Sequence, residues 1–489
     1  MAGTPNYVDV LIIGAGLSGL GAAVHLKDKC PNKSFAIMEQ QPQLGGTWAL
    51  FKYPGIRSDS DMYTLGFKFK PWKSPKAIAD GPAILSYLNE TADEYNLRPH
   101  IQYNAKMVSA DWDSAHAIWT VSFAGGRKMS CNFLFMCSGY YSYESGHTPD
   151  FPGQDDYQGQ IIHPQKWPED LDYAGKNIVV IGSGATAVTL LPSLAKSAKH
   201  VTMLQRSPTY MGVKSSTDWF ANLLKKILPQ QTAYNWTRAK NVFVNNIEYK
   251  FTRKKPERAK KLLLKMVKKE LGPDYPYDPN FTPRYNPWDQ RVCLVPDGDM
   301  FTAMKAGKAE VVTDHINRFN ASGVVLKSGA HLPADIIVTA TGLEIQLLGG
   351  ASFTKDSAPI DISKTYSYEG MMFSGVPNLA SVFGYVNASW TLRADLIAEY
   401  TCRMINHMDE TNQPVAMPAA PDGMTPRPWI DFEAGYLARA VDKLPKQGDF
   451  APWLNLHNYA RDKKLFPSKP VDDGVMQFSR PSELLDAAE

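Results

Sequence analysis

Two glycine-rich segments have the residue types and spacing that bind the phosphates of a dinucleotide. Each follows an apolar run typical of a β-strand and precedes a run of small residues typical of a helix. Their key positions are Gly14, Gly16 and Gly19 in "IIGAGLSG", and Gly182, Gly184 and Ala187 in "VIGSGATA". The first glycine permits a tight turn, the second lets the backbone approach a pyrophosphate, and the third position must be small for helix and strand to pack. Two such turns predict two dinucleotide sites.

The strands that follow the two turns end differently, which distinguishes the two nucleotides. Glu39 lies about twenty residues past the first turn, where a carboxylate accepts hydrogen bonds from ribose hydroxyls, as in FAD. Arg206 takes the corresponding place after the second turn, where a guanidinium neutralises a 2′-phosphate, as in NADPH. The alternative for Arg206 is an ordinary surface arginine. We therefore expect FAD at the first turn and NADPH at the second.

The rest of the sequence predicts an α/β fold with two doubly wound Rossmann-like domains, each discontinuous, and a helical insertion. Apolar strands at 131–142 and 334–344 mark crossings between the domains. The alternating run at 108–131 predicts a β-hairpin inserted in the first domain, and residues 309–332 predict the corresponding meander of the second. The assigned boundaries are 1–142 and 372–489 for the FAD domain, 143–214 and 301–371 for the NADPH domain, and 215–300 for the insertion.

The insertion combines an apolar helical stripe with a basic helix. "TDWFANLLKKIL" predicts an amphipathic helix with one apolar stripe, which consists of Trp219, Leu223 and Ile227 together with Phe220, Leu224 and Leu228. Residues 253–270 predict a strongly basic helix, which we interpret as a solvated face. Contact of this helix with a membrane surface or a partner is the less favoured alternative. The Pro- and Tyr-rich stretch after it predicts an ordered loop.

The composition is typical of a globular protein with more than one domain. The 489 residues are 44% hydrophobic and 21% charged, and they exceed what one compact core holds. A net charge of +3 gives no support for nucleic-acid binding. The apolar residues 8–26 contain four glycines and lack a basic flank, so we expect neither a membrane span nor a signal peptide. Five cysteines without paired or metal-ligand spacing predict a reducing cytoplasm and no metal site.

An NADPH site beside an FAD site predicts hydride transfer from nicotinamide to flavin. The next electron acceptor is a disulfide, another electron carrier or dioxygen. The sequence contains no close pair of cysteines, which disfavours the disulfide. The residues alone leave the other two acceptors open.

Two motifs resemble those of the class B flavoprotein monooxygenases, specifically the type I Baeyer-Villiger monooxygenases. "GGTWALFKYPGIRSD" matches the early motif of that family at every fixed position, which are Gly45, Gly46, Trp48, Tyr53, Pro54, Gly55 and Asp59. "YQGQIIHPQKWP" matches the second motif at Gly159, His163, Trp167 and Pro168, and departs from it at Tyr157 and Pro164. Segments such as "YNPWDQR" and "GYVNASWTLRADL" are most similar to the subgroup of the ethionamide-activating monooxygenase.

The resemblance implies a reaction of oxygen at the reduced flavin. The deprotonated flavin-oxygen adduct attacks a carbonyl carbon, whereas the protonated adduct gives oxygen to sulfur, so ketone oxidation requires the protein to stabilise an anion. In this family an arginine in a short segment such as "WDQR" does so, which here is Arg291, and the carboxylate of the early motif, Asp59, pairs with it. As alternatives, Arg291 could be structural, and Asp59 could cap a helix that begins near residue 60.

Other residues take supporting roles in this interpretation. Gly46, Thr47, Trp48 and Trp390 contact the cofactors, His163 is a structural residue of the linker, and Arg57 has no assigned role. We expect an NADPH- and O2-dependent FAD monooxygenase that converts ketones to esters or lactones, with sulfoxidation of thioethers as a side activity. The alternatives are a monooxygenase of nitrogen or sulfur and an electron-transfer flavoprotein without oxygenase turnover. The sequence fixes neither the physiological substrate nor the oligomeric state.

Overall fold

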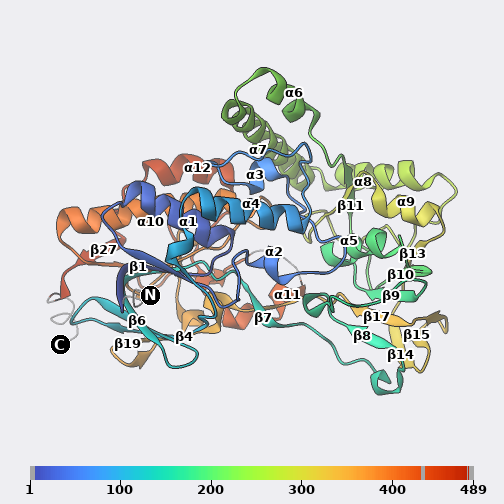
Figure 1. Cartoon of the computed structure of the whole chain (residues 1–489), viewed down its shortest axis with the longest axis horizontal. Helices are drawn as coiled ribbons and strands as arrows, with labels where there is room; N and C mark the ends of the chain where they lie inside the picture. The colour runs from blue at the N-terminus through green and yellow to red at the C-terminus, as the bar shows by residue number, and fades with distance from the viewer. Residues whose placement is uncertain (1–5, 431–434, 482, 484–489) are drawn as a thin grey trace.

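The computed structural model describes residues 6–430, 435–481 and 483 of the chain. These residues form two α/β units side by side, with helices of the insertion above them (Figure 1). Each unit contains parallel strands, and one strand of each, Tyr7–Ile13 in the first and Asn177–Ile181 in the second, runs into a glycine turn and a helix. The predicted fold class is confirmed.

The first unit is built on a nine-stranded sheet. Its parallel part has the order β6–β1–β2–β3. These strands are β1 (Tyr7–Ile13), β2 (Phe35–Met38), β3 (Ile101–Gln102) and β6 (Lys128–Met136). Most of β1 is buried, as an apolar strand covered on both faces requires. The helix after it, α1 (Leu17–Lys29), packs against α10 (Trp390–Thr411), and β23 (Leu379–Ser381) pairs with β6.

The same sheet contains the predicted hairpin, as part of a meander, and one strand that was assigned elsewhere. β4 (Met107–Asp113) and β5 (Ile118–Phe123) form the antiparallel meander with β6. β19 (Ser352–Lys355) pairs in parallel with β4, and β20 (Ala358–Pro359) follows it. The sequence placed these residues in the second unit, with the return to the first at 372. The chain returns earlier because the edge of β4 has unpaired backbone groups that β19 satisfies.

The second unit has a five-stranded parallel sheet of order β13–β10–β9–β17–β8. The strands are β8 (Gln160–Ile162), β9 (Asn177–Ile181), β10 (His200–Gln205), β13 (Ala309–Thr313) and β17 (Ile336–Thr339). The second glycine turn leads from β9 into α5 (Ala185–Leu194). The predicted meander is β14 (Ile316–Asn320), β15 (Gly323–Leu326) and β16 (His331–Pro333). Residues 309–313 were expected within this meander but form β13, which pairs in parallel with β10. The reason is that the side chains of Ala309 and Val311 are buried in the core of the second unit.

An antiparallel ribbon lies where the chain crosses between the units, and consists of β7 (Tyr141–Gly146) and β18 (Leu343–Ile345). Further helices are α2 (Thr47–Leu50), α3 (Met62–Leu65), α4 (Gly81–Glu94), α9 (Asp299–Lys305), α11 (Gly435–Ala438) and α12 (Tyr459–Ser468). Further strands are β11 (Met211–Lys214), β12 (Cys293–Pro296), β21 (Ser367–Tyr368), β22 (Met372–Phe373), β24 (Val415–Pro418), β25 (Arg427–Pro428), β26 (Lys446–Gln447) and β27 (Met476–Ser479).

The insertion consists of α6 (Trp219–Ile227), α7 (Gln230–Lys254) and α8 (Pro256–Leu271). Buried Arg238 of α7 donates to the carbonyl oxygens of Tyr63 and Gly66, at 2.9 and 2.8 Å, and lies 3.4 Å from the carboxylate of Asp395 on α10. These bonds fix α7 on the first unit, whereas α8 packs against β11 and α9. In α6, Leu224 is buried. No helix within the described ranges is long and apolar enough to cross a membrane.

The glycine turns owe their residue types to close backbone contacts. A Cβ atom at Gly19 would lie 1.8 Å from the carbonyl oxygen of Gly14, which itself has a φ of +106°. In the second turn, a Cβ atom at Gly182 would lie 2.3 Å from the carbonyl oxygen of Ala340. A Cβ atom at Gly184 would meet no atom within 4 Å. Packing therefore requires glycine at 14, 19 and 182, but at 184 only a ligand can require it.

We expect Gly19→Ala to lower the free energy of unfolding by about 3 kcal/mol, because the added methyl group collides with rigid backbone. Gly184→Ala is the matched control, since its methyl group enters open space at a φ of −80°. Circular dichroism melts of both purified variants would measure the difference. Equal melting temperatures would contradict the packing role of Gly19.

Candidate active site

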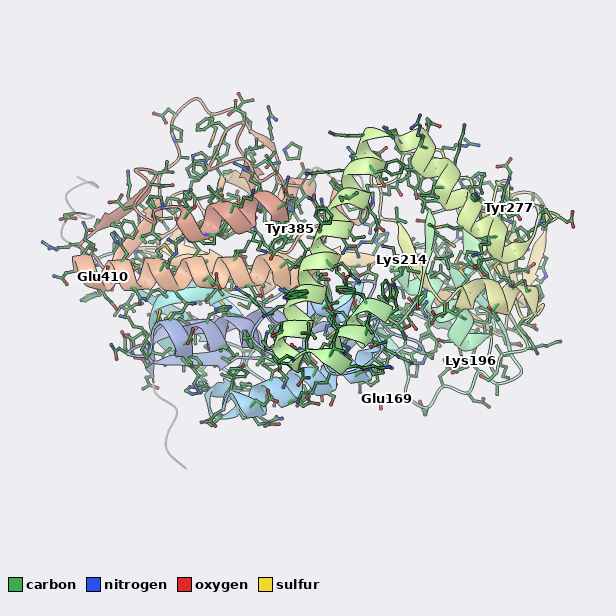
Figure 2. All side chains as sticks on the ribbon, turned by 90° about the horizontal axis from the view of Figure 1, so that it is seen from above. Glu169, Lys196, Lys214, Tyr277, Tyr385 and Glu410 are labelled. Atoms are coloured by element: carbon green, nitrogen blue, oxygen red, sulfur yellow. The ribbon has the colours of Figure 1, made fainter. Side chains whose placement is uncertain are left out.

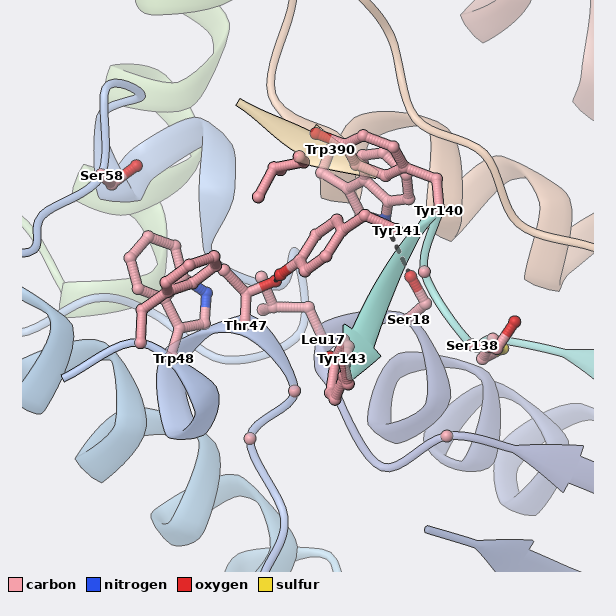
Figure 3. A pocket seen from close by; sticks show the side chains of 18 of the residues that line it. Leu17, Ser18, Thr47, Trp48, Ser58, Ser138, Tyr140, Tyr141, Tyr143 and Trp390 are labelled. Atoms are coloured by element: carbon pink, nitrogen blue, oxygen red, sulfur yellow. Dashed lines mark hydrogen bonds between the residues drawn. The ribbon is translucent and has the colours of Figure 1, made fainter. Parts of the chain in front are cut away.

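A cavity of about 360 Å³ lies between the two glycine turns. Gly14 and Gly16 line it from the first turn, and Ala185 and Thr186 line it from the start of α5. Figure 3 shows aromatic side chains around this space, drawn from α2, β7 and α10. Residues that are distant in the sequence thus surround one volume, as two adjoining dinucleotide sites require.

The first turn and Glu39 form a cradle that fits the adenosine diphosphate part of FAD. Gly16 lines the cavity at the N-terminus of α1, where backbone N–H groups favour phosphate. The buried carboxylate of Glu39 accepts hydrogen bonds from the N–H groups of Ala15 and Gln41, at 2.7 and 2.8 Å. Burial raises the pKa of Glu39, and the backbone donors oppose that rise. Its oxygens retain acceptor capacity for ribose hydroxyls.

The loop after β2 brings Gly46, Thr47 and Trp48 to the cavity. Gly46 has a φ of +57°, and its Cβ atom would lie 3.1 Å from Cα of Gly16, so the loop crosses the first turn at close range. The hydroxyl oxygen of Thr47 lies 2.6 Å from that of Tyr141. Trp48 packs against the core of the first unit and also lines the cavity (Figure 3). These positions agree with the predicted wrapping of a cofactor.

Trp390, at the start of α10, lies on the same cavity. Its Nε1–H donates to the hydroxyl of Ser18 at 2.8 Å, and its ring stacks on Tyr140 with ring centroids 5.3 Å apart (Figure 3). Sequence reasoning missed the tyrosines at 140, 141 and 143, which also line the cavity. The sequence "CSGYYSY" could have indicated these tyrosines, because residues that directly follow a strand of a Rossmann sheet lie at the edge of the sheet where ligands bind.

The structure brings Arg291 and Asp59 together. Nη1 of Arg291 lies 3.2 Å from Oδ2 of Asp59, and both side chains line the cavity. The two side chains are 46% and 37% exposed. Asp59 does not cap the following helix, because the N-cap of α3 is Asp61, whose carboxylate accepts from the N–H groups of Tyr63 and Thr64 at 3.1 Å. The alternative role considered for Asp59 is therefore wrong.

Arg57, to which the sequence gave no role, forms a bidentate ion pair with Asp299 at the start of α9. The Arg57 side chain is 16% exposed, so this pair is better shielded from water than that of Arg291. A bidentate pair of this kind holds its partners in one geometry. Sequence analysis missed Asp299 because no pattern in the residues around it indicates that it pairs with Arg57, 242 positions earlier in the chain.

The second turn and Arg206 occupy a more open surface. Gly182, Gly184 and Ala187 do not line the cavity, but they form the turn that precedes α5. Ala187 is buried in the core of the second unit, as the third position of the motif requires. Arg206 directly follows β10 and is exposed. Within the described part of the chain, no carboxylate lies within ion-pair distance of Arg206.

His163 lies where the linker contacts the crossing ribbon. A Cβ atom at Gly146 would collide with its imidazole ring, and Nδ1 of His163 accepts from the N–H of Gln165 at 3.2 Å. Burial lowers the pKa of His163, which keeps the ring neutral. These contacts support the structural role that the sequence suggested.

None of the five cysteines forms a disulfide. All five are free and buried, and Cys137 lines the cavity without a second thiol beside it. Burial raises the pKa of the Cys293 thiol to about 11. Across the described residues, no group of three or more histidines, cysteines or carboxylates could hold a metal ion.

A buried polar network supports the cavity wall at Tyr385. The Tyr385 hydroxyl donates to Asp462 at 2.7 Å, and Arg393 forms an ion pair with the same carboxylate. The His457 ring packs edge-on against Phe383 and Tyr385, and neither ring nitrogen has a hydrogen-bond partner among the described residues. Burial, reinforced by the positive charge of Arg393, lowers the pKa of His457 to about 3.

The fold and the site define an oxidoreductase that binds two dinucleotides at adjoining turns. Residues 11–261 match the model of a family described as "Pyridine nucleotide-disulphide oxidoreductase". The chain is 52% identical over 480 residues to "FAD-containing monooxygenase EthA" of Mycobacterium tuberculosis (strain ATCC 25618 / H37Rv), covering 97% of this chain and 98% of the relative. It is 47% identical over 488 residues to "Probable FAD-binding monooxygenase AlmA" of Acinetobacter baylyi, covering 98% of each chain.

Solved structures with the same fold are an oxidized steroid monooxygenase bound to NADP and an open form of cyclohexanone monooxygenase. Their TM-scores are 0.77 and 0.76, their sequence identities are 21% and 22%, and each alignment covers 97% of this chain and all of the other. The chain belongs to the family of FAD-containing monooxygenases that includes EthA. The expected class of flavin- and NADP-dependent monooxygenases is confirmed.

We expect acid to destabilise the folded protein through His457. Its folded pKa of about 3 lies below its ordinary value of 6.5, so the unfolded state binds the proton first and stability falls as the pH drops below 6.5. Between pH 7.5 and 5, this residue should cost about 2 kcal/mol of unfolding free energy.

His457→Asn should remove that loss, and asparagine tolerates the φ of +46° at this position. Denaturant unfolding of both proteins at the two pH values measures the difference. An identical acid loss in the variant would show that the imidazole does not govern it.

Proposed function

We propose that this protein performs Baeyer-Villiger oxidation, converting ketones to esters or lactones with NADPH and dioxygen, and that sulfoxidation of thioethers is a side activity. The observation that carries the proposal is the ion pair of Arg291 and Asp59 on the cavity shared by the two glycine turns. A guanidinium cation at that place favours the anionic oxidant that a carbonyl carbon requires. The name of the structural neighbour cyclohexanone monooxygenase supports a ketone substrate.

The two residues have different tasks in this proposal. Arg291 stays protonated at every working pH and offers a rigid set of N–H donors, so it stabilises negative charge as that charge develops. Asp59, 3.2 Å away, orients the guanidinium and reduces its field. Both side chains are partly exposed, so the pair itself contributes little to stability and can rearrange when ligands bind.

When bound, FAD would supply the acceptor for the hydride of NADPH and the group at which dioxygen is activated. We assign its binding to the first unit, where the residues are Gly14, Gly16, Gly19, Glu39, Gly46, Thr47, Trp48 and Trp390. We assign NADPH to the second unit, where the residues are Gly182, Gly184, Ala187 and Arg206. The aromatic side chains of Trp48 and Trp390 exclude water from the cavity between them. Five free cysteines support a location in the reducing cytoplasm.

Arg291→Ala should lower the rate of ester formation from a phenyl ketone by about a hundredfold or more, because the anion loses its cation. NADPH-driven reduction of FAD should remain, since Arg291 has no part in hydride transfer. Product analysis and anaerobic stopped-flow absorbance measure the two rates separately.

Arg284→Ala is the matched control, because this exposed arginine lies in the same Pro-rich loop. Undiminished ester formation in the Arg291 variant would refute the assignment. A wild-type enzyme that makes only sulfoxide from a ketone and thioether mixture would favour a heteroatom monooxygenase. Rapid reoxidation of its flavin without any oxygenated product would favour an electron-transfer protein.

Arg206→Ala should raise the KM for NADPH about tenfold or more and leave the KM for NADH nearly unchanged, because only NADPH has the 2′-phosphate. Steady-state kinetics with both nucleotides test this. Arg318→Ala, an exposed arginine of β14 in the same unit, is the control. An unchanged preference for NADPH would remove Arg206 from the phosphate site.

A further inference from the structure

The helices of the insertion expose large apolar side chains on a surface where polar side chains are the rule. Trp219 and Ile227 of α6 are 75% and 67% exposed, and Trp236 and Phe243 of α7 are 60% and 64% exposed. The α6–α7 hairpin projects from the top of the molecule (Figure 1), and Figure 2 views the molecule from that side. Several large exposed apolar side chains on two neighbouring helices are typical of an interaction site.

The spacing places these side chains on one face of each helix. Trp219, Leu223 and Ile227 follow one another at intervals of four on α6. On α7, Trp236, Phe243 and Ile247 recur at intervals of seven and four. We call these six residues the outer face. The opposite sides of the helices hold the hairpin on the first unit, through buried residues that are Ala221 and Leu224 on α6, and Ala233, Tyr234, Thr237 and Arg238 on α7.

The insertion is also strongly basic, in contrast with the rest of the chain. Residues 219–271 hold 14 of the 52 lysines and arginines but only 3 of the 49 aspartates and glutamates. The whole chain has a net charge of only +3, so the remainder is net acidic. Lys226 adjoins the outer face on α6, and Lys250 and Lys254 continue it along α7, and all three are exposed.

Apolar and aromatic side chains next to lysines are the composition of a helix that lies in the surface of an anionic bilayer. A second copy of this chain is a poorer occupant, because a twofold interface would bring two basic surfaces together. No described helix could cross the bilayer, so contact would be peripheral. We propose that the outer face of α6 and α7 docks the enzyme on anionic lipid membranes, with its aromatic side chains at the level of the headgroups.

Hydrogen bonds connect helix α7, which carries part of the outer face, to the segment that follows Asp59. Arg238 bonds the carbonyl groups that surround α3, and Nδ2 of Asn241 donates to the carboxylate of Asp61 at 2.9 Å. Asp61 lies two residues after Asp59. These bonds therefore connect the docked helix to the segment that contains Asp59.

The test is co-sedimentation of the FAD-loaded enzyme with vesicles of phosphatidylglycerol and phosphatidylcholine in equal parts. The wild type should bind these vesicles, bind pure phosphatidylcholine much less, and dissociate as salt rises. The double variant Phe243→Gln, Ile247→Gln should lower the partition coefficient about tenfold or more. The matched control Val108→Gln, Leu456→Gln changes exposed apolar residues elsewhere and should bind as the wild type does.

The same assay tests the role of charge. The test variant is Lys250→Gln, Lys254→Gln on α7, and the matched control is Lys463→Gln, Lys464→Gln on α12. Only the first pair should weaken binding to the anionic vesicles. All variants should retain NADPH oxidation, which shows that they fold. Absence of wild-type binding, or equal binding by the outer-face variants, would overturn the proposal. If sedimentation velocity shows a dimer that the Phe243 and Ile247 variant loses, and vesicles bind neither protein, the outer face joins two copies instead.

Discussion

Two ion pairs on one short loop hold the halves of the site together. Asp59 pairs with Arg291, and Arg57, two residues earlier, pairs with Asp299. The loop joins α2 to α3 of the first unit, but its residues Phe51 and Tyr53 pack in the core of the second unit, as β12 does, and both ion-pair partners flank β12. These contacts therefore connect the loop to the residues on either side of β12, next to the cavity between the two glycine turns. The shielded pair of Arg57 fixes the loop, which leaves the more exposed pair of Arg291 to respond to ligands.

The sequence predicted the parts of the site that obey local constraints. The glycine positions follow from contacts between a strand, its turn and the next helix, all within a few residues, as at Gly14 and Gly19. Glu39 follows for the same reason, because β2 must end beside the first turn in a parallel sheet. The pairing of Asp59 with Arg291 came from a family motif rather than from spacing. Arg206 is where the motif places it, and its phosphate contact stays a prediction.

Features that depend on distant neighbours could not be predicted. The pairing of β19 with β4 joins residues more than 240 positions apart, and a short strand has no pattern that names its partner. Asp299 and Tyr385 gained their roles through contacts of the same kind. The apolar stripe of α6 was visible in the sequence, but a helical pattern shows only which face is apolar and not whether anything covers it. The exposure of Trp219 had to come from the structure.

Helix α7 has 25 residues and is therefore about 37 Å long. Its first half is attached to the first unit through Arg238 and Asn241. In its second half, Glu248 pairs with Lys214 of β11, and the chain then passes at Lys255 into α8, which packs against β11 and α9. The helix is therefore attached at both ends and extends from one nucleotide-binding half to the other. Any rotation of one half against the other must bend this helix or break one of its two sets of contacts, so the helix limits that rotation.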